Sequence, residues 1–328
     1  MHSGVYSCTT RHTMYLRTLA TITFLLATPT FGDDAEWTYE EGPNGPENWA
    51  DNYPLCGEPN QSPINIVHDD TVPMKFGGFS FDGCSRTELT DGGYNTSLTN
   101  DGHNIQVRNV GASCIISSDG LPGSFKVDRF HLHWGSDSSK GSEHNLNGRA
   151  MSAELHLACF NMDQSSDILG VGFSVLIEIG QENNAAYDTF LDYIDQAGYR
   201  DDIAHLNRPI PLMELLPEDR ENYYRYNGSK SSPTCYGPGS IIWIVFKEKV
   251  KITETQIEKL RALNTSAPGV SPAERMVNNF RPTQPLGSRT VYRNVVDSDV
   301  SLASMSFVGV ELVLGCIVVF LVTSFARK

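Results

Sequence analysis

Two short segments with alternating side chains constrain this chain more than any other feature of its sequence. The first contains His131 and His133, and the second, further along the chain, contains Glu154 and His156. Successive side chains of an extended strand point to opposite faces, so each pair shares one face of its strand. If the two strands pair, three imidazoles converge. Three neutral histidines with an open fourth position form the ligand set of a catalytic zinc site.

The chemistry of such a site explains why the pattern matters. A zinc ion held by three histidines lowers the pKa of its bound water to about 7 and so supplies hydroxide at neutral pH. The alternative is that each histidine is an ordinary core or surface residue, which is the usual role of a single histidine. The combination of H-x-H with E-x-H favours the metal site, and the cofactor we expect is Zn²⁺.

The composition excludes several classes of function. The chain has 328 residues, enough for one large domain or two ordinary ones. Its formal net charge is −14, and no basic stripe is present, so we expect no nucleic-acid partner. The 7 cysteines include no CxxC pair, which argues against a zinc finger built on thiolates.

The N-terminus has the pattern of a secretory signal. Arg11 and Arg17 are followed by an apolar run over 18–27 that is too short to span a bilayer. Small residues near Thr30 and Gly32 suggest cleavage just before Asp33. We therefore expect residues 1–32 to be a signal peptide, with a buried helix as the alternative.

Four Asn-x-Ser/Thr sequons are compatible with N-glycosylation in the secretory pathway. They begin at Asn60, Asn95, Asn227 and Asn264. The first is the weakest candidate because Pro63 follows it, so we expect glycans at the other three.

The C-terminal region is directed to a membrane. Residues 307–326 form a hydrophobic segment in which Glu311 is the one charge. Two interpretations compete: a transmembrane helix, or a glycolipid-anchor (GPI) signal in which small residues over 298–304 precede a tail that is removed. Glu311 is costly in a lasting membrane span, which favours the GPI anchor. Either alternative attaches the folded part to the extracellular face of the plasma membrane.

The region between these ends reads as one domain, over 33–293, with a polar stalk over 294–306 rich in Ser, Asp and Val. Short apolar runs are broken by Gly, Pro, Asn and Asp, and there is no low-complexity linker or internal repeat. This pattern predicts a sheet-dominated α+β domain with short surface helices. We expect strands at 105–110, 125–134, 153–160, 171–179 and 241–245, and helices at 184–197 and 253–263.

A series of motifs along this domain identifies a resemblance. In chain order they are WTY at 37–39, NGPENW at 44–49, QSPIN at 61–65, NDGH at 100–103, FHLHWG at 130–135, GSEH at 141–144, AELH at 153–156, YNGS at 226–229, WIVF at 243–246 and NFRPTQPL at 279–286. Over roughly 36–290 the chain resembles the α-class carbonic anhydrases, most of all their secreted and membrane-attached branch. The resemblance implies a single domain on a large twisted, mostly antiparallel central sheet, with zinc at the base of a conical cleft. It also implies the reversible hydration of carbon dioxide to bicarbonate and a proton.

The resemblance assigns roles around the metal. The three histidines of the opening pattern match the zinc ligands. Glu154 matches the carboxylate partner of His156, and the backbone carbonyl of Asn279 matches the partner of His133. Arg129 stands where the family usually has a glutamine that supports the first ligand. Arginine has donors only, so we expect weakened or altered zinc binding without loss of the site.

The resemblance also implies a catalytic set. In the family a threonine backed by a glutamate orients the attacking hydroxide; here Ser231 and Glu143 match, because serine and threonine offer the same donor and acceptor. His103 falls on the position of the proton shuttle, a role suited to a side chain that titrates near pH 6.5. Tyr39 and Gln106 match residues that order the intervening waters.

The pocket that receives carbon dioxide is expected to have an altered shape. Lys230 replaces a leucine of the apolar wall, and it would either extend outward to solvent or weaken substrate binding. Ala158 and Gly172 stand where larger residues are usual. Trp243 forms the aromatic wall, and Ser232 also lines the pocket.

The resemblance pairs Cys56 with Cys235, a disulfide that would tie the N-terminal segment to the loop carrying Ser231. Cys84, Cys114 and Cys159 leave room for one further pair, which we do not assign.

Two other functions stay open. One is a non-catalytic relative used for binding or adhesion, although such relatives usually lose a zinc histidine and this chain keeps all three. The other is a zinc hydrolase acting mainly on esters, for which the sequence defines no subsite. The partners we expect are carbon dioxide, bicarbonate and water, with the membrane reached through the C-terminal anchor. No oligomeric state is predicted.

Overall fold

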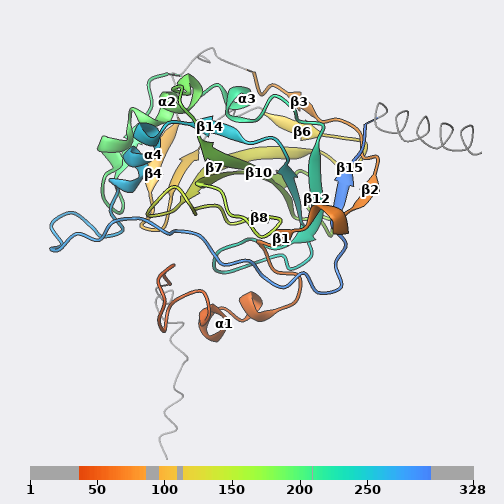
Figure 1. The fold of residues 1–328 in the computed structure, drawn as a ribbon, viewed down its shortest axis with the longest axis horizontal. Coiled ribbons are helices and arrows are strands. Elements are labelled where there is room, and N and C mark those ends of the chain that lie inside the picture. The colour runs from red at the N-terminus through yellow and green to blue at the C-terminus, as the bar shows by residue number, and fades with distance from the viewer. Residues whose placement is uncertain (1–36, 86–95, 109–113, 209, 297–328) are drawn as a thin grey trace, which may run out of the picture. The chain divides into compact units, whose positions relative to one another are not determined.

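The structure is a computed structural model that describes residues 37–85, 96–108, 114–208 and 210–296. Within these residues a single sheet of 13 strands dominates the fold (Figure 1). From one edge to the other its main path runs through β11 (Ile203–His205), β4 (Ser97–Asn100), β5 (Ile105–Arg108), β7 (Phe125–Trp134), β9 (Ala153–Asn161), β10 (Gly170–Ile179), β13 (Ile241–Phe246), β12 (Tyr223–Gly228), β15 (Tyr292–Asn294) and β2 (Val72–Met74). Off this path, β14 (Val250–Ile252) pairs with β10, and β6 (Ile115–Ser117) pairs with both β7 and β3 (Ser80–Asp82).

Most neighbouring strands of this sheet are antiparallel, and the parallel pairs are β10 with β13, β10 with β14 and β15 with β2. A separate two-stranded sheet joins β1 (Asn65–Ile66) to β8 (Asn145–Leu146). The predicted sheet-dominated α+β class is confirmed. The strand expected over 125–134 has these bounds as β7, and the other expected strands match to within a few residues.

The helices are short. They are α1 (Trp49–Asn52), α2 (Ala185–Leu191), α3 (Leu212–Leu215) and α4 (Glu254–Arg261), with 3₁₀ turns at Pro54–Gly57, His68–Asp70 and Ile194–Ala197. A capping box fixes the start of α4: the Thr253 hydroxyl accepts from the backbone of Gln256, and the Gln256 side chain accepts from the backbone of Thr253. The helix expected over 184–197 is shorter than predicted, because α2 ends at Leu191 and its continuation tightens into a 3₁₀ turn.

The burial pattern of β7 shows why the sheet carries a site on one face. Phe130, Leu132 and Trp134 are fully buried in the apolar core. Because side chains alternate along a strand, the same packing directs His131 and His133 to the opposite face. A β-bulge precedes them: Val127 and Arg129 pair with consecutive residues of β9, which leaves Asp128 as the extra residue. Bulges change the direction of nearby side chains and often lie beside active sites.

Two disulfides are present in the described part of the chain. The predicted bond between Cys56 and Cys235 forms and closes a sequence separation of 179 residues. The pair left unassigned is Cys84 with Cys114, and Cys159 is a buried free thiol. Cys235 lies on the loop that follows β12, so the first bond ties that loop to the N-terminal segment.

The structure corrects two expectations about the chain's periphery. Asn264 is 5% exposed, and its side-chain amide donates to the Gly198 carbonyl at 3.0 Å, so it does not fit a glycosylated asparagine. Asn227 is exposed and stays a candidate. Asn294, expected to begin the stalk, is instead a buried residue of β15 that bonds to the backbone of Phe76 and Glu221.

Several predictions concern residues outside those that the structure describes: the signal peptide over 1–32, the glycan at Asn95, most of the stalk, and the hydrophobic segment over 307–326. Among the helices of the described residues, none is both long and apolar enough to cross a membrane.

Candidate active site

The pairing of β7 with β9 brings the three expected ligands together. In this antiparallel register His131 faces His156, and His133 faces Glu154. The centroids of the three imidazole rings are 4.7–5.1 Å apart, and one ring nitrogen of each lies within 4.8 Å of the others. The convergence that the alternating pattern predicts is therefore formed.

Two of these imidazoles are held by acceptors on their outer sides. The Nδ1 of His133 donates to the backbone carbonyl of Asn279 at 2.6 Å, and the Nε2 of His156 donates to Oε1 of Glu154 at 2.6 Å. These bonds leave His133 Nε2 and His156 Nδ1 without protons, and the two atoms are 3.2 Å apart. Two ligands about 2.0–2.1 Å from a zinc ion in a tetrahedral site lie about 3.3 Å apart, so the spacing fits zinc.

Burial favours the neutral imidazoles that a metal requires. It lowers the pKa of His131 well below the usual value, and the neighbouring histidines add to this effect. Burial also lowers the pKa of His133, against the opposing charge of Glu143. At His156 burial again opposes the charged form, but the charge and hydrogen bond of Glu154, together with the charge of Glu143, outweigh it and raise the pKa. That carboxylate pairing is the usual outer partner of a metal-bound histidine.

Glu154 is the centre of a buried polar network that the sequence did not reveal. Its Oε1 also accepts from Nδ1 of His144 at 2.7 Å and from the Ser174 hydroxyl at 2.6 Å. On its far side, His144 is hydrogen-bonded to the Tyr226 hydroxyl at 2.7 Å. Burial would raise the pKa of Glu154, but the two histidines outweigh it and hold that pKa well below its usual value. His144 could have been found in the GSEH motif, whereas Ser174 carries no local signal.

The third imidazole lacks such support. The Nδ1 of His131 is buried and has no hydrogen-bond partner among the described residues. Arg129, two residues earlier on the same strand face, directs its NH1 to Asp128 at 2.5 Å, and its own Nε is also buried and unpaired. The arginine does not replace the acceptor that a glutamine would offer at this position.

Glu143 and Ser231 lie near the ligands but are not bonded to each other. Oε1 of Glu143 accepts from the backbone of Arg281 at 2.9 Å, whereas Oε2 is buried without a partner. That oxygen lies 3.6 Å from Nε2 of His133 and 3.8 Å from Nδ1 of His156. The expected hydrogen bond from Ser231 to Glu143 is thus not formed in this structure.

The expected pocket residues share one cavity with two of the histidines. His131 and His156 line it together with Ala158, Gly172, Lys230, Ser231, Ser232 and Trp243. A Cβ atom on Gly172 would lie 3.0 Å from the Trp243 ring, so the indole occupies space that a larger residue would need. The small residues at 158 and 172 shape this pocket, and the indole of Trp243 packs close against Gly172.

Lys230 is a largely buried cation in this cavity. Its ammonium donates to the carbonyl of Pro233. Burial, reinforced by the charge of Arg129, lowers the pKa of Lys230 to about 8. The charged form is therefore destabilised in the folded protein.

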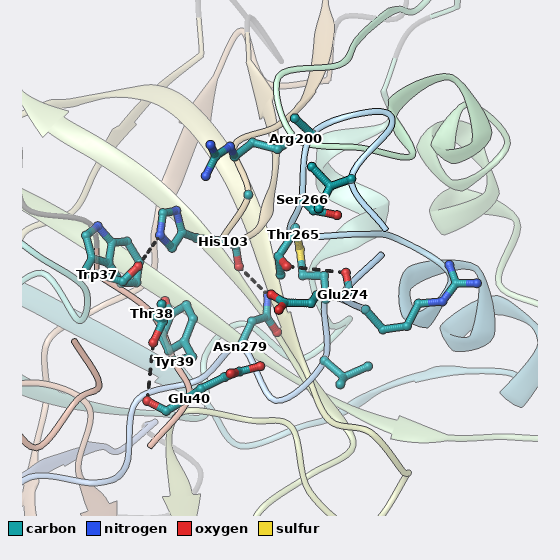
Figure 2. A pocket seen from close by; sticks show the side chains of 16 residues that line it. Trp37, Thr38, Tyr39, Glu40, His103, Arg200, Thr265, Ser266, Glu274 and Asn279 are labelled. Carbon is teal, nitrogen blue, oxygen red and sulfur yellow. Dashed lines mark hydrogen bonds between the residues drawn. The ribbon is translucent and has the colours of Figure 1, made fainter. Parts of the chain in front are cut away.

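His103 lies in a different cavity, at the N-terminal segment (Figure 2). Its Nε2 donates to the backbone carbonyl of Trp37 at 2.8 Å, and its ring stacks on Trp37 with centroids 3.7 Å apart. Tyr39 contacts Trp37 on one side and His133 on the other, at centroid distances of 5.1 and 6.3 Å. Gln106 faces His131 across β5 and β7. Tyr39 and Gln106 therefore border the metal ligands, whereas His103 is turned to Trp37.

Comparisons with known proteins agree with this geometry. Residues 44–295 match the sequence profile of the eukaryotic-type carbonic anhydrases. The chain is 34% identical over 320 residues to human carbonic anhydrase 12, covering 90% of this chain and 85% of that protein. It is 31% identical over 270 residues to human carbonic anhydrase 3, covering 78% of this chain and 97% of that protein. It is also 33% identical over 273 residues to human receptor-type tyrosine-protein phosphatase zeta, covering 79% of this chain but 11% of that receptor.

We predict that Lys230→Leu raises the free energy of unfolding at pH 7. The pKa of Lys230 falls from 10.5 to about 8 on folding, so between these pH values the unfolded chain binds more protons and stability rises with pH. The substitution should abolish that rise and add about 1–3 kcal/mol at pH 7. Urea unfolding at pH 7 and pH 10 measures both effects, with the exposed Lys126→Leu as control. Identical pH dependence in the wild type and Lys230→Leu would contradict the prediction.

Proposed function

The chain belongs to the eukaryotic-type carbonic anhydrase family, and from this premise we propose that it hydrates carbon dioxide to bicarbonate and a proton with zinc held by His131, His133 and His156. The observation that carries the proposal is the convergence of these three nitrogens, two of them with their protons fixed on the outer side. A zinc ion bound there would supply Lewis-acid activation of a water molecule at neutral pH. The reaction is reversible, so bicarbonate is also a substrate.

The residues around the ligands have separate tasks. Glu154 and the Asn279 carbonyl hold two imidazoles in the tautomer and orientation that binding requires. Ser231 and Glu143 orient the nucleophile. The free Oε2 of Glu143 can accept the proton of the Ser231 hydroxyl, which leaves the lone pairs of that hydroxyl for the nucleophile. Glu143 lies beside His133 and His156, and Ser231 lines the cavity that His131 and His156 also line.

Carbon dioxide binds in the cavity beside the ligands, against Trp243 and over Ala158 and Gly172. This wall is apolar and small, which suits an uncharged linear molecule. Ser232 borders the same cavity. The positive charge of Lys230 makes the cavity less apolar than a leucine would.

For the metal site, we predict that purified protein binds one zinc ion per chain and accelerates carbon dioxide hydration above the buffer rate. His156→Ala should lose zinc and lower kcat/KM by more than about 100-fold, because it removes a ligand, not only an outer partner. Stopped-flow hydration and metal analysis measure the two effects. His205→Ala, at an exposed position of β11, is the matched control. If fully zinc-loaded protein hydrates carbon dioxide no faster than buffer alone, the proposed activity is wrong and a binding role is favoured.

His103 carries protons from the site to the buffer. The support is the position of His103: Tyr39 contacts both His133 and Trp37, and the His103 ring stacks on Trp37. A rotation away from Trp37 would bring the imidazole toward the cleft. An imidazole can both accept and release a proton, which suits this role.

We predict that His103→Ala slows turnover, by up to about 100-fold, because a positioned acid–base group is lost. Added imidazole buffer should partly restore the rate, while kcat/KM at high buffer concentration changes less. Stopped-flow measurements over a series of imidazole concentrations test this. If turnover of the variant equals that of the wild type in every buffer, His103 is not the shuttle.

The enzyme acts at the outer face of the plasma membrane. Its two disulfides are the kind of bond that persists in oxidising compartments. The signal peptide and the hydrophobic segment over 307–326 would export the chain and attach it. Glu311 within that segment favours the glycolipid anchor over a transmembrane helix.

The anchor has a direct test. Cells expressing the full chain should release the protein into the medium when treated with a phosphatidylinositol-specific phospholipase, because the phospholipase cuts the lipid from a GPI anchor but does not cut a transmembrane polypeptide. Western blotting of medium and cell fractions measures the release, with a known transmembrane protein as control. Retention on the cells would instead indicate a transmembrane helix.

A further inference from the structure

Lys230 brings an amine to the cavity in which carbon dioxide is proposed to bind. Its backbone is fixed, because its N–H donates to the Tyr236 carbonyl at 3.0 Å and its carbonyl accepts from the Ser229 hydroxyl at 2.9 Å. The disulfide at Cys235 ties the same loop to the N-terminal segment. The Lys230 side chain lines the cavity, and part of its surface is accessible to solvent. A small molecule in the cavity can therefore reach this lysine.

The surroundings of Lys230 favour the neutral amine, which is the nucleophilic form. Burial disfavours the ammonium and the charge of Arg129 adds to this effect, so the pKa falls to about 8 although the charges of Asp101 and Glu143 oppose the shift. At pH 7.4 about one amine in five is then neutral, compared with about one in a thousand for a lysine at its usual pKa. None of the carboxylates of the described residues lines the cavity. The titratable side chains that share the cavity with Lys230 are Arg129, His131, His156, Cys159 and Tyr236.

A neutral lysine amine adds to carbon dioxide without any further reactant. The lone pair of Nζ forms a bond to the carbon, one C=O π pair moves onto oxygen, and the nitrogen releases a proton to solvent. The products are a carbamate, R–NH–COO⁻, and H⁺, with nothing oxidised or reduced. The reaction is reversible, and because it releases protons, higher pH at constant dissolved carbon dioxide favours the carbamate.

The surroundings of Lys230 also suit the carbamate. The largest of the charge effects on Lys230 comes from Arg129, and an anion in place of the ammonium turns that repulsion into an attraction. The carbamate keeps one N–H, which is enough for the Pro233 carbonyl that the ammonium donates to. The cavity measures about 60 Å³, and one water needs about 10–15 Å³, so there is room for the added carboxylate group.

We propose that Lys230 is a carbamylation site: its amine reacts reversibly with carbon dioxide, and the carbamate occupies the cavity that the next substrate molecule requires. High carbon dioxide at alkaline pH therefore slows the enzyme through its own substrate. The binding of carbon dioxide in this cavity rests on the proposed function, whereas the reaction of the amine needs no zinc.

Isotope labelling and chemical trapping measure the carbamate directly. Purified full-length, zinc-loaded protein is equilibrated with carbon dioxide labelled with carbon-13, at constant pressure, across pH 6.5 to 8.5. Carbon NMR should show a protein-bound carbamate resonance, distinct from carbon dioxide and bicarbonate, that grows with pH. A trialkyloxonium ion, which converts carbamates to stable esters, followed by digestion and mass spectrometry, should locate the ester on Lys230. No ester on Lys230 at any pH would overturn the proposal.

Two variants and one control separate Lys230 from the other amines of the chain. Lys230→Leu removes the nucleophile, and Lys230→Arg keeps a charge on a guanidinium that does not lose its proton, so both should lose this resonance. Lys126→Leu, at an exposed position, should keep it. The terminal α-amino group also reacts, because its pKa is about 7.7–8.0, and its ester should persist in every variant. Equal labelling of all four proteins would place the carbamate elsewhere and overturn the site.

Stopped-flow hydration measures the consequence for turnover. Wild-type enzyme equilibrated with carbon dioxide at pH 8.5 should start roughly twofold or more slower than enzyme kept free of it, because the modified cavity does not admit substrate. Lys230→Arg, confirmed as folded by circular dichroism, should start at the same rate after either treatment. An ester on Lys230 without any slowing would overturn the block.

Failure of this inference is distinguishable from failure of the proposed function. Normal hydration by zinc-loaded protein that carries no ester on Lys230 rejects only the carbamylation site. An ester on Lys230 in protein that binds no zinc supports the carbamylation site and rejects only the proposed metal site.

Discussion

The register between β7 and β9 is the constraint on which the rest of the structure depends. It sets His131 opposite His156 and His133 opposite Glu154, and it places Phe130 and Leu132 in the core. A slip of one residue would exchange the two faces, burying the imidazoles and exposing the apolar side chains. A single strand pairing therefore buries the apolar side chains and also brings the three imidazoles together. Stability of the core and assembly of the site cannot be separated in this sheet.

A second layer of the site lies under the ligands and is polar and buried. Glu154 accepts hydrogen bonds from His156, His144 and Ser174, so a carboxylate with no exposure to solvent is fully satisfied. A satisfied network of this kind holds its members in one arrangement, whereas an unpaired buried charge would be costly. The contrast with His131 is marked. Of the three histidines that could hold a metal, two have hydrogen-bonded acceptors on the outer side, whereas Nδ1 of His131 has none among the described residues.

The sequence was most informative where the chemistry follows strand periodicity. The bounds of β7 and the convergence of three histidines on it and β9 could both be predicted, because alternation along a strand decides which side chains meet. Prediction failed where contacts between distant segments decide the outcome. The sequon at Asn264 is a local pattern, but the fold buries that side chain. Ser174 gives no local signal for its bond to Glu154, and the sequence does not show that Glu143 bonds to the backbone of Arg281 instead of to Ser231.

The contact between Gly172 and Trp243 has a consequence for how this family can vary. The indole packs where a Cβ of residue 172 would lie, at 3.0 Å. A valine or leucine at 172 therefore overpacks the wall unless the indole moves at the same time. The two positions are energetically coupled neighbours, and their substitutions will not add. The shape of this pocket is therefore set jointly by residue 172 and the indole: a bulkier side chain at 172 needs a compensating shift of Trp243.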